Sequence, residues 1–306
     1  MRYRVTHRTS YGYSRAVQDS VGLFHLIPRQ LPWQQVLASR VVVTPGPEDL
    51  NADTDYFGNS TTYFHVTRSH RELEIESTSE VVAEVPVYDE AALQTPWELS
   101  RPLLASDGAA STAADAWRAT DYALESARVA HLPEVADYAA ESLLPGRPIG
   151  EAATDLMQRI HRDFAYDSTA TTVTSTVADV MRKRAGVCQD FAHLALACLR
   201  GHGVAARYVS GYLATQPPPG KERVVGADAS HAWLAVWMPG SGQWLAIDPT
   251  NDQWANERYV TVAWGRDYGD VSPVKGIIYT KAKKSTLRVS VDVAPLDHAP
   301  LAPAAS

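Results

Sequence analysis

Two cysteines are the first residues in this chain that could carry covalent chemistry. Cys188 and Cys198 fall on one predicted helix, and their spacing puts the two Cα atoms about 15 Å apart at 1.5 Å per residue. A disulfide needs Cα atoms within about 7 Å, so these thiols are not partners. Cys198 shares the apolar stripe of the helix with Phe191 and Leu194, as expected of a buried residue. Cys188 opens the helix, where unpaired backbone N–H groups favour a thiolate.

A histidine and an aspartate that could serve such a thiol lie on one predicted hairpin. Residues 230–248 contain two apolar strands joined by the loop Pro239-Gly240-Ser241-Gly242. Pairing across a four-residue loop puts His231 and Asp248 on one face of the hairpin, as diagonal neighbours. A loop that is one residue longer or shorter would put them on opposite faces.

Cysteine, histidine and aspartate in this chain order suit a thiol nucleophile. The thiolate of Cys188 would attack a carbonyl carbon, and His231 would take the thiol proton and later protonate the leaving amine. Asp248 would hold the imidazole in the required tautomer. Each residue also has a purely structural interpretation, because a sheet histidine can simply be hydrogen-bonded and Asp248-Pro249 can be a turn that ends a strand.

The segments that must position these residues fall into distinct stretches. Residues 1–88 contain short β-branched and aromatic runs separated by Gly, Pro and Asn, which predicts an antiparallel β-sandwich. The pattern of residues 89–150 predicts a helical connecting segment. Residues 151–285 are predicted to form the core that carries the site. Residues 286–293 alternate apolar and polar and could complete the N-terminal sandwich, whereas residues 295–306 predict a flexible tail.

Composition excludes several classes of function. The chain has 306 residues, of which 45% are hydrophobic and 21% charged, as is usual for soluble globular proteins. Its formal net charge of -7 argues against binding to nucleic acid. No apolar run is long enough for a membrane helix, and the first residues do not form a secretory signal. Two cysteines make no disulfide framework, so we expect a cytoplasmic protein with no membrane partner.

Four separated segments resemble, in the right order, the transglutaminase-like superfamily. They are Arg184 to Leu194 around Cys188, Arg207 to Tyr212, Ser230 to Trp233 around His231, and Ile247 to Thr250 around Asp248. Residues 265–276 and the β-rich residues 1–88 resemble a bacterial branch of this superfamily.

This resemblance implies an α+β fold with a papain-like core, in which the cysteine-bearing helix packs on an antiparallel sheet. It also implies that Cys188, His231 and Asp248 form a triad for acyl chemistry on amides. Nothing in the sequence resembles the calcium sites of animal transglutaminases, and no His or Cys residues have metal-ligand spacing. We therefore expect no metal and no cofactor.

Two further residues are candidates for contact with substrate or with an oxyanion. Tyr166 falls where the superfamily often keeps an upstream oxyanion residue, and the backbone N–H of Cys188 is the other candidate donor. Trp233, with Trp237 and Trp244 on the same hairpin face, could wall an acyl groove. The structural alternatives are a packed or exposed tyrosine and a tryptophan core.

The function that these residues predict is cysteine-dependent hydrolysis of a peptide or protein amide. One alternative is a protein-glutamine γ-glutamyltransferase, in which an amine takes the acyl group in place of water. Another is a non-catalytic peptide-binding module on the same fold, against which the intact Cys/His/Asp set speaks. A redox thiol protein is disfavoured because the chain has no Cys-x-x-Cys motif.

Overall fold

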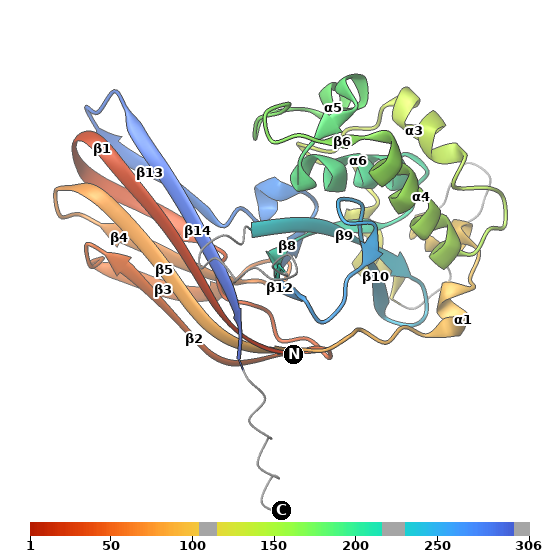
Figure 1. Ribbon diagram of the computed structural model, residues 1–306, viewed down its shortest axis with the longest axis horizontal. Coiled ribbons are helices and arrows are strands. Elements are labelled where there is room, and N and C mark those ends of the chain that lie inside the picture. Colours follow the sequence, from red (N-terminus) through yellow and green to blue (C-terminus); the bar gives the residue numbers. More distant parts are fainter. Residues whose placement is uncertain (104–114, 216–229, 297–306) are drawn as a thin grey trace, which may run out of the picture.

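The computed structural model describes residues 1–103, 115–215 and 230–296 of the chain. A large curled sheet stands beside a core in which helices pack on a second sheet (Figure 1). The larger sheet has seven strands in the order β2-β5-β1-β4-β3, with β13 and β14 also paired to β1. Their bounds are β1 Arg2–Phe24, β2 Gln34–Thr44, β3 Asp49–Thr54, β4 Ser60–Val66, β5 His70–Ala83, β13 Val274–Thr280 and β14 Ser285–Pro295.

Strand β1 is central to this sheet because it is long enough to pair with two strands along each of its halves. Its first half lies between β5 and β14, and its second half lies between β4 and β13. The register with β5 shifts between Gly12 and Val17, where an irregularity of this kind bends a strand. The sheet closes over an apolar core in which Phe24 stacks on Phe64, with ring centroids 6.0 Å apart. The antiparallel sandwich of the sequence interpretation is thus one continuous curled sheet.

The last two strands of this sheet come from the far end of the chain and lie beside β1 in Figure 1. β14 pairs with β1 from Tyr3↔Pro295 to Tyr13↔Ser285, which is the pairing that the alternation in residues 286–293 suggests. β13 also pairs with β1, so residues 274–280 belong to the curled sheet and not to the predicted core. The predicted flexible tail is residues 295–306, and its part beyond residue 296 lies outside the described residues.

The core is built on a five-stranded sheet of order β11-β10-β9-β8-β12. These strands are β8 Ala206–Leu213, β9 Ser230–Met238, β10 Gln243–Asp248, β11 Gln253–Trp254 and β12 Tyr259–Gly265, and the short strands β6 Ala165–Tyr166 and β7 Ala185–Gly186 pair separately. The α-helices are α1 Glu90–Leu93, α2 Ala116–Ala119, α3 Pro133–Ala140, α4 Ile149–Asp163, α5 Val177–Lys183 and α6 Cys188–Gly201. Single 3₁₀ turns are η1 Trp97–Ser100, η2 Thr120–Tyr122 and η3 Tyr268–Asp270.

Helix α6 is the centre of the core. From Asp190 to Arg200 every residue is buried, because other elements cover the helix on all sides. It packs against α3, α4 and α5 and against one face of β8 and β9. Within residues 1–103, 115–215 and 230–296, no helix is both long and apolar enough to cross a membrane.

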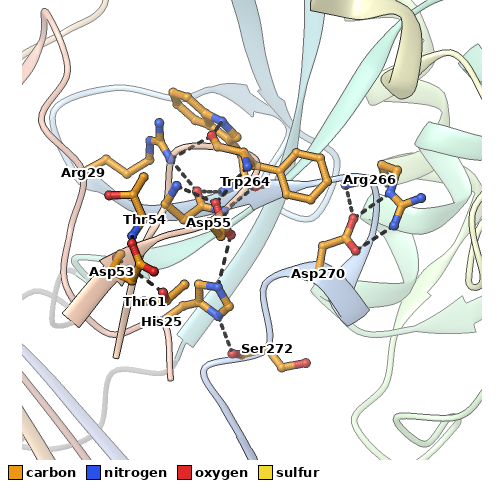
Figure 2. A network of polar contacts seen from close by, with 12 residues as sticks. His25, Arg29, Asp53, Thr54, Asp55, Thr61, Trp264, Arg266, Asp270 and Ser272 are labelled. Carbon is orange, nitrogen blue, oxygen red and sulfur yellow. Dashed lines mark hydrogen bonds and ion pairs between the residues drawn. The ribbon is translucent and has the colours of Figure 1, made fainter. Parts of the chain in front are cut away.

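Amide side chains from the curled sheet bind the free edge of β12 and join the two parts. Gln34 accepts from the N–H of Thr261 and donates to its carbonyl oxygen, both at 2.7 Å. Asn59 makes the same pair of bonds with Trp264, at 2.8 and 2.9 Å. His25 Nδ1 lies 3.1 Å from the carbonyl oxygen of Ser272, within the network shown in Figure 2. The bonds to Thr261 and Trp264 satisfy backbone groups that the edge strand β12 would otherwise leave unpaired.

Removal of the first ninety residues should therefore expose core surface. Tyr3, Val5, Val81 and Ala83 of the curled sheet share one buried cluster with α4 and α6, and β14 would also lose its partner. We expect a chain that begins at Ala91 to aggregate, as measured by size-exclusion chromatography and thermal melting. A soluble, cooperatively melting and fully active fragment would contradict this dependence.

Candidate active site

The N-terminus of α6 presents Cys188. The carboxylate of Asp190 accepts from the N–H of Val187 at 2.9 Å and from the hydroxyl of Thr171 at 2.5 Å, which fixes the first turn of the helix. A Cβ on Gly186 would lie 2.7 Å from that carboxylate, so only glycine fits there. Cys188 thus has a defined place at the N-terminus of α6, the positive end of the helix dipole.

The two cysteines differ in their surroundings. Cys188 is partly exposed, whereas Cys198 is fully buried in the core. Burial raises the pKa of the Cys198 thiol to about 12. Cys198 is therefore a packing residue, and Cys188 is the cysteine that a substrate can reach.

The hairpin of β9 and β10 has the predicted register. Met238 pairs with Gln243 and Trp237 pairs with Trp244 across the four-residue loop, so the prediction is confirmed. His231 Nε2 lies 2.7 Å from Asp248 Oδ2. Cys188 is close enough to raise the pKa of the imidazole. Because Nε2 faces Asp248 and Asn251, Nδ1 is the nitrogen left for the thiol. The structure thus brings together the three residues that the sequence proposes.

Asp248 is held by more donors than the sequence suggests. It is fully buried, and its Oδ2 also accepts from Asn251 Nδ2 and from the Tyr259 hydroxyl, each at 2.7 Å. Its Oδ1 accepts from the N–H of Thr250 at 2.9 Å. Gln253 donates in turn to the Tyr259 oxygen at 2.6 Å. This network fixes the carboxylate in the direction of His231.

These contacts set the charges of the pair. Burial disfavours both charged forms, but it is outweighed in each case. The contacts of His231 with Asp248 and with Cys188 raise the pKa of the imidazole to about 10. The bonds from His231, Asn251 and Tyr259 hold the pKa of Asp248 below its usual value. At neutral pH the site therefore contains an imidazolium beside a carboxylate.

Trp233 lies behind the imidazole and not in a groove. It is 1% exposed, stacks on His231 with centroids 6.0 Å apart, and meets Tyr259 edge-on at 5.2 Å. A Cβ on Gly211 would lie 2.6 Å from the Trp233 ring, so the strand passes directly beneath it. So deeply buried a side chain offers a substrate no surface. We therefore assign Trp233 to positioning His231, in place of the predicted substrate contact.

Tyr166 lies at the rim of the site. Its strand β6 pairs in parallel with β7, which puts Tyr166 opposite Gly186, two residues before Cys188. Its side chain is 62% exposed. Partial burial and the neighbouring Cys188 raise the pKa of its phenol, so the hydroxyl remains a donor at neutral pH. Tyr166 thus stays a candidate for contact with substrate.

Sequence reasoning missed Asn251, Tyr259 and Gln253. Asn251 follows Asp248 by three residues. A short polar side chain just after an Asp-Pro turn is the sequence signal that could have indicated its contact with Asp248. Tyr259 begins β12, which pairs with β8 at the far edge of the sheet, so only the fold could place it beside Asp248. Among the described residues, no three His, Cys, Asp or Glu side chains are grouped so that they could hold a metal ion.

Tyr259 should act as a positioning residue. In Tyr259→Phe the carboxylate of Asp248 loses one charge-assisted hydrogen bond, which we expect to lower kcat by about tenfold with KM unchanged. Tyr138→Phe is a matched control, because the hydroxyl of Tyr138 also donates to a carboxylate, that of Asp163 at 2.9 Å, away from the triad. Equal kinetics in the two variants, measured on one substrate, would show that Tyr259 does not support the triad.

Two family models match separate stretches of this chain. The bacterial transglutaminase-like N-terminal region matches residues 3–82, and the transglutaminase-like superfamily matches residues 136–249. The second match contains Cys188, His231 and Asp248. The chain belongs to the transglutaminase-like superfamily.

Relatives of this transglutaminase-like protein match it over nearly its whole length. An uncharacterized protein of Mycobacterium tuberculosis is 47% identical over 302 residues, which cover 97% of this chain and 93% of the relative. An uncharacterized protein of Mycobacterium leprae is 33% identical over 295 residues, which cover 95% of this chain and 98% of the relative.

A solved structure shares the fold. The crystal structure of a candidate cysteine protease from Cytophaga hutchinsonii matches with a TM-score of 0.74 at 20% identity, and the match covers 98% of this chain and 93% of that one. Both the curled sheet and the core are therefore common to the two proteins. This likeness shows a common fold. Membership of the superfamily supports thiol-dependent catalysis in broad terms.

Proposed function

We propose that this transglutaminase-like protein hydrolyses amide bonds in a peptide or protein substrate with Cys188 as the nucleophile. The observation that carries the proposal is the position of His231, whose Nε2 lies 2.7 Å from Asp248 Oδ2 and whose pKa is raised by both Asp248 and the neighbouring Cys188. A nucleophile, a base in contact with it and a third group that orients the base are the requirements of covalent acyl transfer.

The reaction proceeds in two halves. The thiolate of Cys188 adds to the amide carbon, and the His231 imidazolium gives its proton to the departing amine, so the C–N bond breaks and a thioester remains. Water then enters, His231 removes a proton from it, and the thioester C–S bond breaks to release the acid. Asp248 stays ionised throughout and stabilises the imidazolium.

The oxyanion of each tetrahedral intermediate needs donors. The backbone N–H of Cys188 lies in the first turn of α6, where N–H groups have no acceptor within the helix. The hydroxyl of Tyr166 is the second donor in this proposal, because its strand runs beside Gly186.

Tyr166→Phe tests that second donor. Loss of one oxyanion-hole donor costs on the order of 10²-fold in kcat, and the largely exposed side chain leaves the fold unaffected. Steady-state kinetics on a peptide substrate should show lower kcat at constant Tm. An unchanged kcat would show that the Tyr166 hydroxyl is not an oxyanion donor and that Tyr166 is only a surface residue.

The proposed reaction is tested by mass spectrometry of a peptide library incubated with the protein, with and without a primary amine. We expect new peptide termini, or conversion of side-chain amides to acids, that depend on Cys188 and are insensitive to the amine. Incorporation of the amine with loss of ammonia would replace hydrolysis by γ-glutamyl transfer. No product from any peptide would contradict both reactions and favour a binding module.

A further inference from the structure

A large cavity lies between the curled sheet and the core, away from the triad. Its volume is about 1060 Å³, and neither Cys188, His231 nor Asp248 lines it. Its walls come from the loop around Trp33, the turn at Tyr56-Phe57, the α2–η2 segment and the hairpin of β9 and β10. The walls are rich in indole rings, namely those of Trp33, Trp117, Trp237, Trp244 and Trp264.

A buried arginine faces this cavity. Arg207 lies on β8 opposite Ala235, lines the cavity and is only 8% exposed. Its guanidinium carbon is 3.6 Å from the centroid of the Trp264 ring and 4.4 Å from that of Trp244. Two aromatic faces therefore hold the guanidinium flat and in one place.

Arg207 has no counter-ion in the described part of the chain. Neither a carboxylate nor a hydrogen-bond acceptor pairs with it there, and its Nε is buried without a partner. Burial and the nearby Arg29 lower the pKa of Arg207 to about 9, so it still carries a charge at neutral pH. A buried charge without a counter-ion is costly. A bound anion would supply the missing opposite charge.

The other charged groups near the cavity are already engaged or exposed. Arg29 stacks on Trp264 as well, at 3.6 Å, but its Nη1 donates to Asn59 and Phe57 within the network of Figure 2. Asp115 accepts from Trp237 Nε1 at 3.1 Å, and the Tyr56 hydroxyl donates to Asp121 at 2.6 Å. Arg118 and Glu84 are exposed at the rim. The Nε of Arg29 is also buried without a partner, but its Nη1 has acceptors, whereas among the described residues no acceptor pairs with any donor of Arg207.

We propose that this cavity binds a small organic carboxylate with a planar apolar body. The carboxylate would take two parallel N–H bonds from the Arg207 fork, and the body would pack against the surrounding indole rings. The site is separate from the Cys-His-Asp triad, and the inference does not rest on the reaction proposed for the triad.

The test is isothermal titration of the full chain with naphthalene-2-acetate and with its neutral amide, naphthalene-2-acetamide. We expect the acid to bind. The affinity for the amide should be lower by about tenfold or more, because the amide cannot make the charge-assisted bidentate contact. Arg207→Gln should lose about tenfold or more in affinity for the acid. The exposed Arg118→Gln, which lines the same cavity, is the control and should retain binding within about threefold.

Several outcomes would overturn the proposal. They are equal affinity for acid and amide, equal affinity in Arg207→Gln and wild type, and no binding of the acid to wild type. If Arg207→Gln does not fold, the comparison of acid and amide on the wild-type chain decides alone. Cys188→Ala should bind the acid as wild type does, and loss of binding there would place the probe at the triad instead.

Discussion

Cys188→Ala is expected to abolish turnover while the fold survives. Cys188 is the first residue of α6, and alanine is a good helix former there. The thiol packs only partly against the core, so its loss changes little of the buried surface. Turnover of a peptide substrate and a thermal melt, measured on the same preparation, give the two readouts.

Cys198→Ala is the matched control for that variant. Cys198 is fully buried, and its truncation should cost about 1 kcal/mol of stability, as small core truncations do. Activity should be retained, because this thiol lies in the core and not at the site. Equal loss of activity in both folded variants would contradict the assignment of Cys188 as the sole nucleophile.

The second large effect is expected at Asp248. Asp248→Asn keeps the shape of the side chain but removes the charge that His231, Asn251 and Tyr259 converge on. We expect kcat to fall by about 10²–10⁴-fold, since the imidazole can then adopt the wrong tautomer. His231→Ala should be at least as damaging, because the leaving amine loses its acid. Activity of Asp248→Asn within about threefold of wild type would show that the carboxylate does not orient His231.

The same pair also contributes stability that depends on pH. The pKa of His231 is raised from 6.5 to about 10 on folding, so its contribution is fully present below pH 6.5 and is lost as the pH rises towards about 10. The pKa of Asp248 is lowered, so its contribution is present above its unfolded value and is lost as the pH falls through the lower folded value.

Local pattern was sufficient to predict the hairpin and the helix of the site. A loop of four residues and the two-residue period of strands together determine the face on which His231 and Asp248 lie. Cys188 was placed at a helix start because the apolar stripe of that helix begins just after it and Gly201 ends it. Both features depend on residues that are close in the chain.

Contacts between distant segments could not be predicted in this way. Tyr259 reaches Asp248 only because β12 pairs with β8 on the other side of β9, and β13 joins β1 from the opposite end of the chain. Arg207 gave no sign in the sequence that it is buried, since its two indole partners come from β10 and β12. Such placements depend on the register and order of the strands.

The most direct test of the account is the rate of alkylation of Cys188 as a function of pH. It is measured with iodoacetamide and mass spectrometry on wild type, His231→Ala and Asp248→Asn. A neighbouring imidazolium stabilises a thiolate, so wild type should react at lower pH than His231→Ala, with Asp248→Asn between the two. Superimposable curves for all three proteins would mean that neither residue acts on the thiol, and the triad would have to be abandoned.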